Sequence, residues 1–240
     1  CVTDMLRATK ELTASHNLST NMTDELYIAG YSMGGWATLC LQKAIETDYS
    51  DEFNLKASAC SAGPYDLLFI NSHILALENY PMPYFLGYML DSYTKLGDIT
   101  NNISDIVNEP YASKIPILYD GTLDGEQINN QLTTSVDDLL TTEYRDGFLA
   151  NPDFSSVRLT LLNNSVIAWN LTTPLAILHG AEDDFVTPQV SENLYEDFLS
   201  KGASENLVQI SIFPDIDHPA GIIPCGIASI NWFLQIKDSS

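Results

Sequence analysis

The alternation of hydrophobic and polar positions predicts strands and helices in turn at both ends of the chain. Short apolar runs that alternate with stretches of good helix formers are typical of a parallel sheet with helical crossovers. The expected strands are Glu25–Ala29, Leu55–Cys60, Pro174–Leu178 and Asn206–Phe213. The expected helices around them are about Thr3–His16, Trp36–Ala44, one that starts near Thr187 and one after His218. The pattern therefore indicates an α/β fold.

The middle of the chain has a different pattern, with helical periodicity and no clear strand. More than a hundred residues separate the strand ending at Cys60 from the one starting at Pro174, and ordinary crossovers are far shorter. The expected helices of this region are Leu67–Leu77, Tyr84–Leu96, Val136–Phe148 and Ser155–Leu162. We predict a core made of residues 1–62 and 174–240, with residues 63–173 inserted as a helical cap over the active site.

The cap contains a segment rich in aromatic and methionine side chains, Tyr80–Leu90. Such side chains line acyl-binding pockets, although helix-spaced apolar residues more often form the core of the cap itself. The candidate substrate-binding residues of the whole chain are Tyr31, Tyr65, Tyr84, Phe85 and Tyr88.

The most specific motif lies between the strand Glu25–Ala29 and the helix that follows it, and reads Gly-Tyr-Ser-Met-Gly-Gly from Gly30. A G-x-S-x-G turn between a strand and a helix exposes a serine hydroxyl, here that of Ser32. The backbone N–H of Met33, the next residue, is the expected oxyanion donor at the start of the helix. The alternative is an ordinary glycine-rich turn.

A candidate acid follows the strand at Pro174–Leu178, in the pattern His-Gly-x-x-Asp-x-x-Val that begins at His179. This pattern resembles the stretch that carries the triad acid in many α/β-hydrolases, and the resemblance implies Asp183 as the acid in preference to its neighbour Asp184. The alternative role for Asp183 is to cap the helix that starts near Thr187.

The candidate base is one of four histidines, and His218 is the choice because it follows the last expected strand. His16 lies in a polar stretch, His73 lies in the cap, and His179 is expected to pack or bond locally. A solvated loop histidine is the alternative for His218. Ser32, Asp183 and His218 then follow the serine, acid, histidine order of one hydrolase fold.

These motifs resemble the α/β-hydrolase superfamily, in particular its secreted bacterial lipase and esterase group. The resemblance rests on residues 30–35, 62–67 and 179–183 and on His218. The segment Asp4–Ala8 also resembles the helix that precedes the nucleophile strand in those enzymes. The resemblance implies a mostly parallel sheet flanked by helices, a large helical cap insertion, and a Ser32–Asp183–His218 triad. The chain would correspond to the carboxyl-terminal part of that fold.

The chain departs from this family at its start, because only 29 residues precede Gly30. We expect the first strands, and the loop that supplies a second oxyanion N–H, to be absent from this sequence. The exposed sheet edge would then be covered by the missing amino-terminal part of the same protein, the expected partner. Activity of this chain alone is uncertain on this interpretation.

Composition and charge narrow the possible partners. The chain is 45% hydrophobic and 18% charged, and its 32 acidic against 10 basic residues give a net charge of −22. This charge disfavours nucleic acids and anionic lipids. No run of 18 apolar residues is present, so no transmembrane segment is predicted. We expect a secreted or periplasmic protein.

The four cysteines match no zinc-binding spacing, and neither a metal nor a cofactor is predicted. Cys40 and Cys60 are expected as buried thiols, whereas Cys1 or Cys225 would join a disulfide if the protein is exported.

The predicted activity is hydrolysis of carboxylic esters, from small esters to lipids, through an acyl-enzyme. A prolyl-oligopeptidase-type serine peptidase is the first alternative, but the 151 positions between Ser32 and Asp183 disfavour it. A non-catalytic or inactive hydrolase fragment is the second alternative, and the short start of the chain motivates it.

Overall fold

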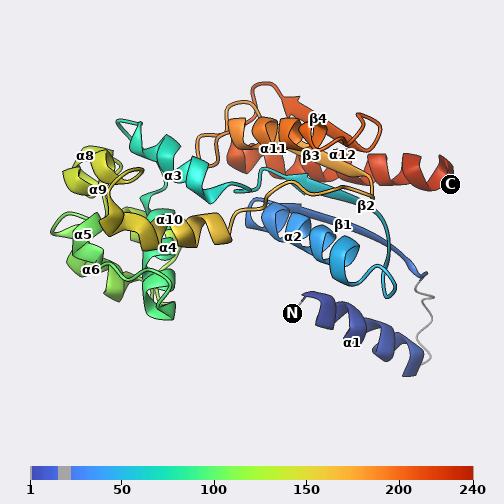
Figure 1. Ribbon diagram of the computed structural model, residues 1–240, viewed down its shortest axis with the longest axis horizontal. Coiled ribbons are helices and arrows are strands. Elements are labelled where there is room, and N and C mark those ends of the chain that lie inside the picture. The colour runs from blue at the N-terminus through green and yellow to red at the C-terminus, as the bar shows by residue number, and fades with distance from the viewer. Residues whose placement is uncertain (1, 16–22, 240) are drawn as a thin grey trace. The chain divides into compact units, whose positions relative to one another are not determined.

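A computed structural model of the protein describes residues 2–15 and 23–239 and contains a four-stranded parallel sheet (Figure 1). The strands run in the order β1-β2-β3-β4 and are β1 Glu25–Tyr31, β2 Asn54–Ser61, β3 Leu175–Gly180 and β4 Val208–Phe213. All six residues of β3 are buried, which fits its near-continuous apolar sequence. The four predicted strands are thus confirmed, with ends shifted by a few residues.

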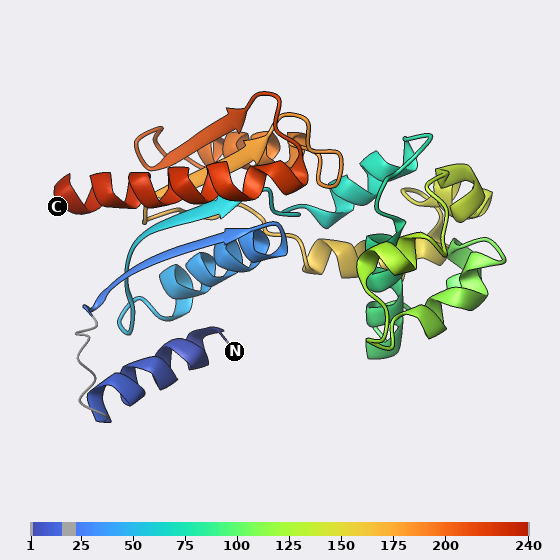
Figure 2. The same cartoon turned by 180° about the vertical axis from the view of Figure 1, so that it is seen from behind.

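Helices cover both faces of this sheet. One face of the sheet carries Gly30, Cys60 and Ile177, which are register partners on neighbouring strands. Helix α2 (Met33–Asp48) covers β1 and β2 on this face, and α11 (Gln189–Ser200) covers β3 and β4. On the opposite face, α12 (His218–Ser239) lies along the sheet (Figure 2), where the ring of Phe233 packs against that of Tyr27. The amino-terminal helix α1 is Val2–Ser15.

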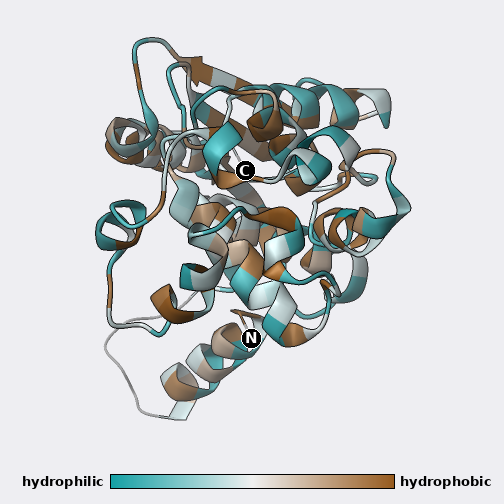
Figure 3. Cartoon of the chain, turned by 90° about the vertical axis from the view of Figure 1, so that its left-hand side faces the viewer, coloured by the Kyte–Doolittle hydropathy of each residue, from teal (hydrophilic) through white to brown (hydrophobic). Residues whose placement is uncertain are grey.

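The chain divides into two compact units, one formed by Cys1–Tyr65 with Val166–Ser240 and the other by Asp66–Ser165. The second unit is helical and has its own core, and its helices mix hydrophobic and hydrophilic residues (Figure 3). Its elements are α3 Leu67–Leu75, α4 Pro83–Leu96, α5 Ile103–Ile106, α6 Tyr111–Leu118, α7 Gly125–Asn129, α8 Val136–Leu139, α9 Thr142–Gly147, the 3-10 helix Pro152–Phe154 and α10 Ser155–Asn163. This unit lies within the region 63–173 expected as an insertion, and its role as a cap stays a prediction.

One predicted helix of this unit is wrong, because the expected helix at Val136–Phe148 is interrupted. Leu140 is extended, with φ −107° and ψ 144°, and forms an antiparallel bridge with Val107. The hydroxyl of Thr141 then accepts a hydrogen bond from the amide of Tyr144 and starts a second helix. The apolar periodicity continues through the break, so hydrophobic spacing alone does not show it.

Helix α12 has an exposed apolar surface. Its long aliphatic side chains Ile222, Ile223, Ile227, Ile230 and Leu234 are each more than half exposed. By length and composition alone, this is the one helix of the described residues that could cross a membrane, which is weak support for a span. The absence of a transmembrane segment therefore stays a prediction.

Candidate functional site

Ser32 lies on a tight turn between β1 and α2, with φ 56° and ψ −124°. Strand and helix approach so closely there that a Cβ on Gly30 would collide with the carbonyl oxygen of Gly34, and one on Gly35 with that of Ser61. A Cβ on Gly34, by contrast, would meet nothing within 4 Å. The turn therefore requires glycine at the first motif position and just after the last one.

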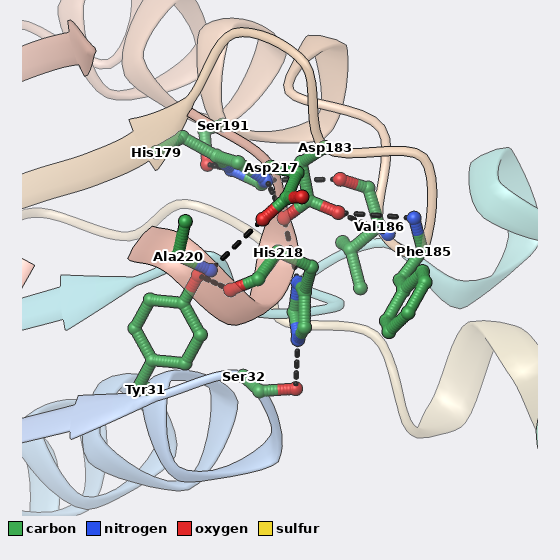
Figure 4. A network of polar contacts seen from close by, with 10 residues as sticks. All are labelled: Tyr31, Ser32, His179, Asp183, Phe185, Val186, Ser191, Asp217, His218 and Ala220. Atoms are coloured by element: carbon green, nitrogen blue, oxygen red, sulfur yellow. Dashed lines mark hydrogen bonds and ion pairs between the residues drawn. The ribbon is translucent and has the colours of Figure 1, made fainter. Parts of the chain in front are cut away.

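The structure brings Ser32, Asp183 and His218 together in one chain of hydrogen bonds (Figure 4). His218 Nε2 lies 2.9 Å from Ser32 Oγ, and His218 Nδ1 lies 2.6 Å from Asp183 Oδ2. The three residues follow β1, β3 and β4, so they meet at the carboxyl edge of the parallel sheet, where sites on such sheets form. The arrangement can move a proton from the serine to an imidazole that a carboxylate orients.

The carboxylate of Asp183 is buried within its own turn. Its Oδ1 accepts hydrogen bonds from the amides of Phe185, at 3.0 Å, and Val186, at 2.9 Å. Burial alone would raise the pKa of Asp183, but hydrogen bonds from His179, His218 and Val186 outweigh it and lower this pKa to about 2. The carboxyl group is therefore ionised near neutral pH. The residue does not cap α11, whose N-cap is Pro188, and Asp184 is exposed.

The position of His218 is fixed by residues around its backbone and ring. The hydroxyl of Tyr31 donates a hydrogen bond of 2.5 Å to the His218 carbonyl, and the rings of Tyr31 and Phe185 each lie 5.2 Å from the imidazole. The amide of Ala220 donates to Asp217 Oδ1 at the start of α12. The hydroxyl of Tyr31 is thus engaged with the histidine backbone, and the role of this residue in substrate binding stays a prediction.

His179 and Ser191 also belong to this network, which sequence reasoning missed except for a local role of His179. His179 Nε2 lies 3.1 Å from Asp183 Oδ2 and 2.9 Å from the carbonyl of Val186. On the other side of the ring, Nδ1 lies 2.7 Å from Ser191 Oγ. The only available signal was the position of His179 at the end of a buried strand.

The remaining sequence candidates have different surroundings. Met33 is the first residue of α2, so the helix's own hydrogen-bond pattern does not use its N–H. Tyr65 is only 1% exposed, and its role in substrate binding stays a prediction. Tyr84, Phe85 and Tyr88 lie on α4 in the second unit, where Tyr88 is exposed and the other two are half-buried.

The described part of the chain has no candidate metal site made of histidines, cysteines and acidic residues. No group of three or more such residues there could hold a metal ion. Cys40, Cys60 and Cys225 are free thiols, and the expected disulfide is not formed by Cys225. His73 lies on α3, while Cys1 and His16 lie outside the described residues.

Comparison with known proteins identifies the fold. No model of a known protein family matches the sequence, and no curated protein matches it either. Among solved structures, a candidate hydrolase from Legionella pneumophila superposes with a TM-score of 0.85 at 25% identity, covering 98% of this chain and 62% of that one. The chain has the α/β-hydrolase fold.

Two enzymes with named activities share this fold. The rice cell wall degrading esterase LipA from Xanthomonas oryzae superposes with a TM-score of 0.75 at 21% identity, covering 97% of this chain and 62% of that one. Candida antarctica lipase A, in its closed state, superposes with a TM-score of 0.70 at 17% identity, covering 96% of this chain and 52% of that one. The present chain thus spans less than two thirds of the length of these structures.

Proposed function

We propose that the protein is a serine hydrolase that cleaves carboxylic esters, with Ser32 as nucleophile, His218 as general base and acid, and Asp183 as the orienting carboxylate. The observation that carries this proposal is the serine–histidine–carboxylate chain of 2.9 Å and 2.6 Å, with its serine on a strand–turn–helix elbow. Ester hydrolysis through a serine triad uses these three groups in contact, and their order along the sequence matches the order typical of the α/β-hydrolase fold.

The proposed reaction proceeds through an acyl-enzyme. Ser32 Oγ attacks the ester carbonyl carbon while His218 Nε2 takes the hydroxyl proton, and the N–H of Met33 stabilises the oxyanion. The tetrahedral intermediate collapses by breaking the bond to the alkoxide, which receives the proton from His218 and leaves as an alcohol. Water then attacks the acyl group, with His218 again transferring the proton, and this step releases the carboxylic acid and restores Ser32. The negative charge of Asp183 stabilises the transient imidazolium.

The substrate class and location are part of the same proposal. The structural neighbours of the protein include an esterase and a lipase, and this supports small-molecule or lipid esters as substrates. The esterase from Xanthomonas oryzae degrades a plant cell wall, and this supports a protein that works outside the cell. The aromatic residues of α4, Tyr84, Phe85 and Tyr88, are the proposed acyl-contacting side chains of the cap.

A fluorophosphonate probe tests the nucleophile. We expect covalent labelling of the full-length protein that carries this sequence, loss of labelling in Ser32→Ala, and retention in the matched control Asp184→Asn, whose side chain is exposed. Absence of labelling that depends on Ser32 would contradict the proposal. Turnover of p-nitrophenyl esters without cleavage of prolyl amides would support an esterase over a peptidase of the prolyl-oligopeptidase type.

We also propose that an amino-terminal part of the same protein covers the apolar face of α12. The exposed aliphatic residues of α12 lie on the sheet face that also carries the exposed Ala29 of β1, an edge strand of the described sheet. Such a surface is typical of a protein contact. Replacing Ile223 and Ile227 by lysine should leave the chain folded and abolish its association with the separately expressed amino-terminal part. Unchanged association in a pull-down would refute this contact.

A further inference from the structure

Two serine–histidine pairs share one oxygen atom of Asp183. Its Oδ2 lies 2.6 Å from Nδ1 of His218, whose other nitrogen contacts Ser32, and 3.1 Å from Nε2 of His179, whose other nitrogen contacts Ser191. Figure 4 shows the carboxylate between the two imidazoles. The reaction proposed above uses only the first of these pairs.

The hydrogen-bond partners of His179 fix the position of its proton. Nε2 faces two acceptors, the carboxylate of Asp183 and the carbonyl of Val186, so this nitrogen must carry a hydrogen. Nδ1 faces the hydroxyl of Ser191 at 2.7 Å, which donates to it when the ring is neutral. Ser191 therefore orients the ring so that Nε2 faces Asp183.

Burial excludes this second pair from chemistry on a substrate. Ser191 and His179 are both 0% exposed, whereas Ser32 is partly exposed. No ester carbonyl can approach the hydroxyl of Ser191 without opening the packing of α11 against β3. The contact of the Ser191–His179 pair with the reacting groups is therefore through Asp183.

We propose that His179, oriented by Ser191, is a positioning residue that holds Oδ2 of Asp183 toward His218. This inference rests on the proposed function. The amides of Phe185 and Val186 bind only Oδ1, and the two imidazoles bind Oδ2, so each oxygen accepts two hydrogen bonds. Without the His179 donor, the turn anchors one oxygen only, and the carboxylate can rotate away from His218. The carboxylate of Asp183, held in this position, can then stabilise the imidazolium of His218.

The first test compares His179→Leu, which removes the donor, with His179→Gln, whose amide N–H can reach the same oxygen. We expect His179→Leu to lower kcat about tenfold at unchanged KM, as for loss of one hydrogen bond to a charged group, and His179→Gln to retain most of the activity. Ser191→Ala removes only the orienting hydroxyl, and we expect a smaller loss of kcat. Equal losses in the Leu and Gln variants, or wild-type kcat in His179→Leu, would overturn the proposal.

The second test does not depend on turnover. The proton between His218 Nδ1 and Asp183 Oδ2 should give a far-downfield NMR signal in the folded protein. We expect this signal to disappear by exchange in His179→Leu and to persist in His179→Gln and in Ser32→Ala. A persistent signal in His179→Leu would refute the positioning role even if the protein hydrolyses esters. Conversely, a protein without Ser32-dependent labelling that showed the expected NMR pattern would contradict only the hydrolase proposal.

Discussion

The backbone of Ser32 leads to a stability prediction that is independent of catalysis. At φ 56° and ψ −124°, a residue with a Cβ is strained by about 1–3 kcal/mol, whereas glycine adopts this conformation without that strain. Ser32→Ala and Ser32→Gly both lose the contact between Oγ and His218, and only the glycine variant removes the Cβ. Comparing these two variants therefore isolates the backbone strain.

The expected difference follows from two opposing terms. Relief of about 2 kcal/mol of strain is offset by about 0.5–1 kcal/mol for the greater freedom of glycine in the unfolded chain. Ser32→Gly should therefore be more stable than Ser32→Ala by about 1 kcal/mol, or about 3 °C in Tm for a domain of this size. Calorimetric unfolding of both variants measures this difference.

A control in the same helix makes the test specific. Ala37→Gly lies inside α2, where glycine should lower the free energy of unfolding by about 1 kcal/mol. We thus expect the two alanine-to-glycine comparisons to have opposite signs. If Ser32→Gly unfolds at a lower temperature than Ser32→Ala, the Ser32 backbone does not store strain and the reasoning is refuted.

Three further predictions concern the same site. His218→Ala should lower p-nitrophenyl ester turnover by several orders of magnitude and Asp183→Asn somewhat less; near-normal rates for His218→Ala would rule out its role as base. The lowered pKa of Asp183, about 2 against 3.8, gives stability that is present above pH 3.8 and lost as the pH falls toward 2, so the advantage of wild type over Asp183→Asn in urea unfolding should shrink with acidification. Gly35→Ala should destabilise the chain by about 1–3 kcal/mol, while Gly34→Ala, with open space around its Cβ, should not lower the free energy of unfolding; equal losses of stability would contradict the close packing at Gly35.

The strands were predictable because each is a short, largely apolar run that ends at a turn, and β4 adds the β-branched residues Val208, Ile210 and Ile212. Buried parallel strands leave little ambiguity, as the all-buried β3 illustrates. The second unit was less predictable, since its short helices depend on local caps. The break at Leu140 depends on a bridge to Val107, 33 positions earlier, and on the cap at Thr141. Hydrophobic periodicity contains neither of these interactions.

The candidate site, too, was predictable from the sequence only in part. The G-x-S-x-G turn and the order of partners were enough to select Ser32, Asp183 and His218, which the structure places in contact. The orientation of Tyr31 was not predictable, because its place against the His218 carbonyl depends on how α12 packs on β1. The burial of Tyr65 likewise depends on tertiary packing and not on its position after a strand.

The shared carboxylate explains why sequence order was needed to choose between two histidines. His179 and His218 both contact Oδ2 of Asp183 and both have a serine at their other nitrogen, so contact geometry alone describes two similar triads. Their surroundings differ, because His179 lies within β3 beneath α11, whereas His218 begins α12 at the open end of the sheet. The fully buried pair can hold the carboxylate but cannot reach a substrate, whereas the pair whose serine is partly exposed can do the chemistry only if its carboxylate stays in place. The two pairs are therefore best understood as complementary parts of one site, with Asp183 as the group that couples them.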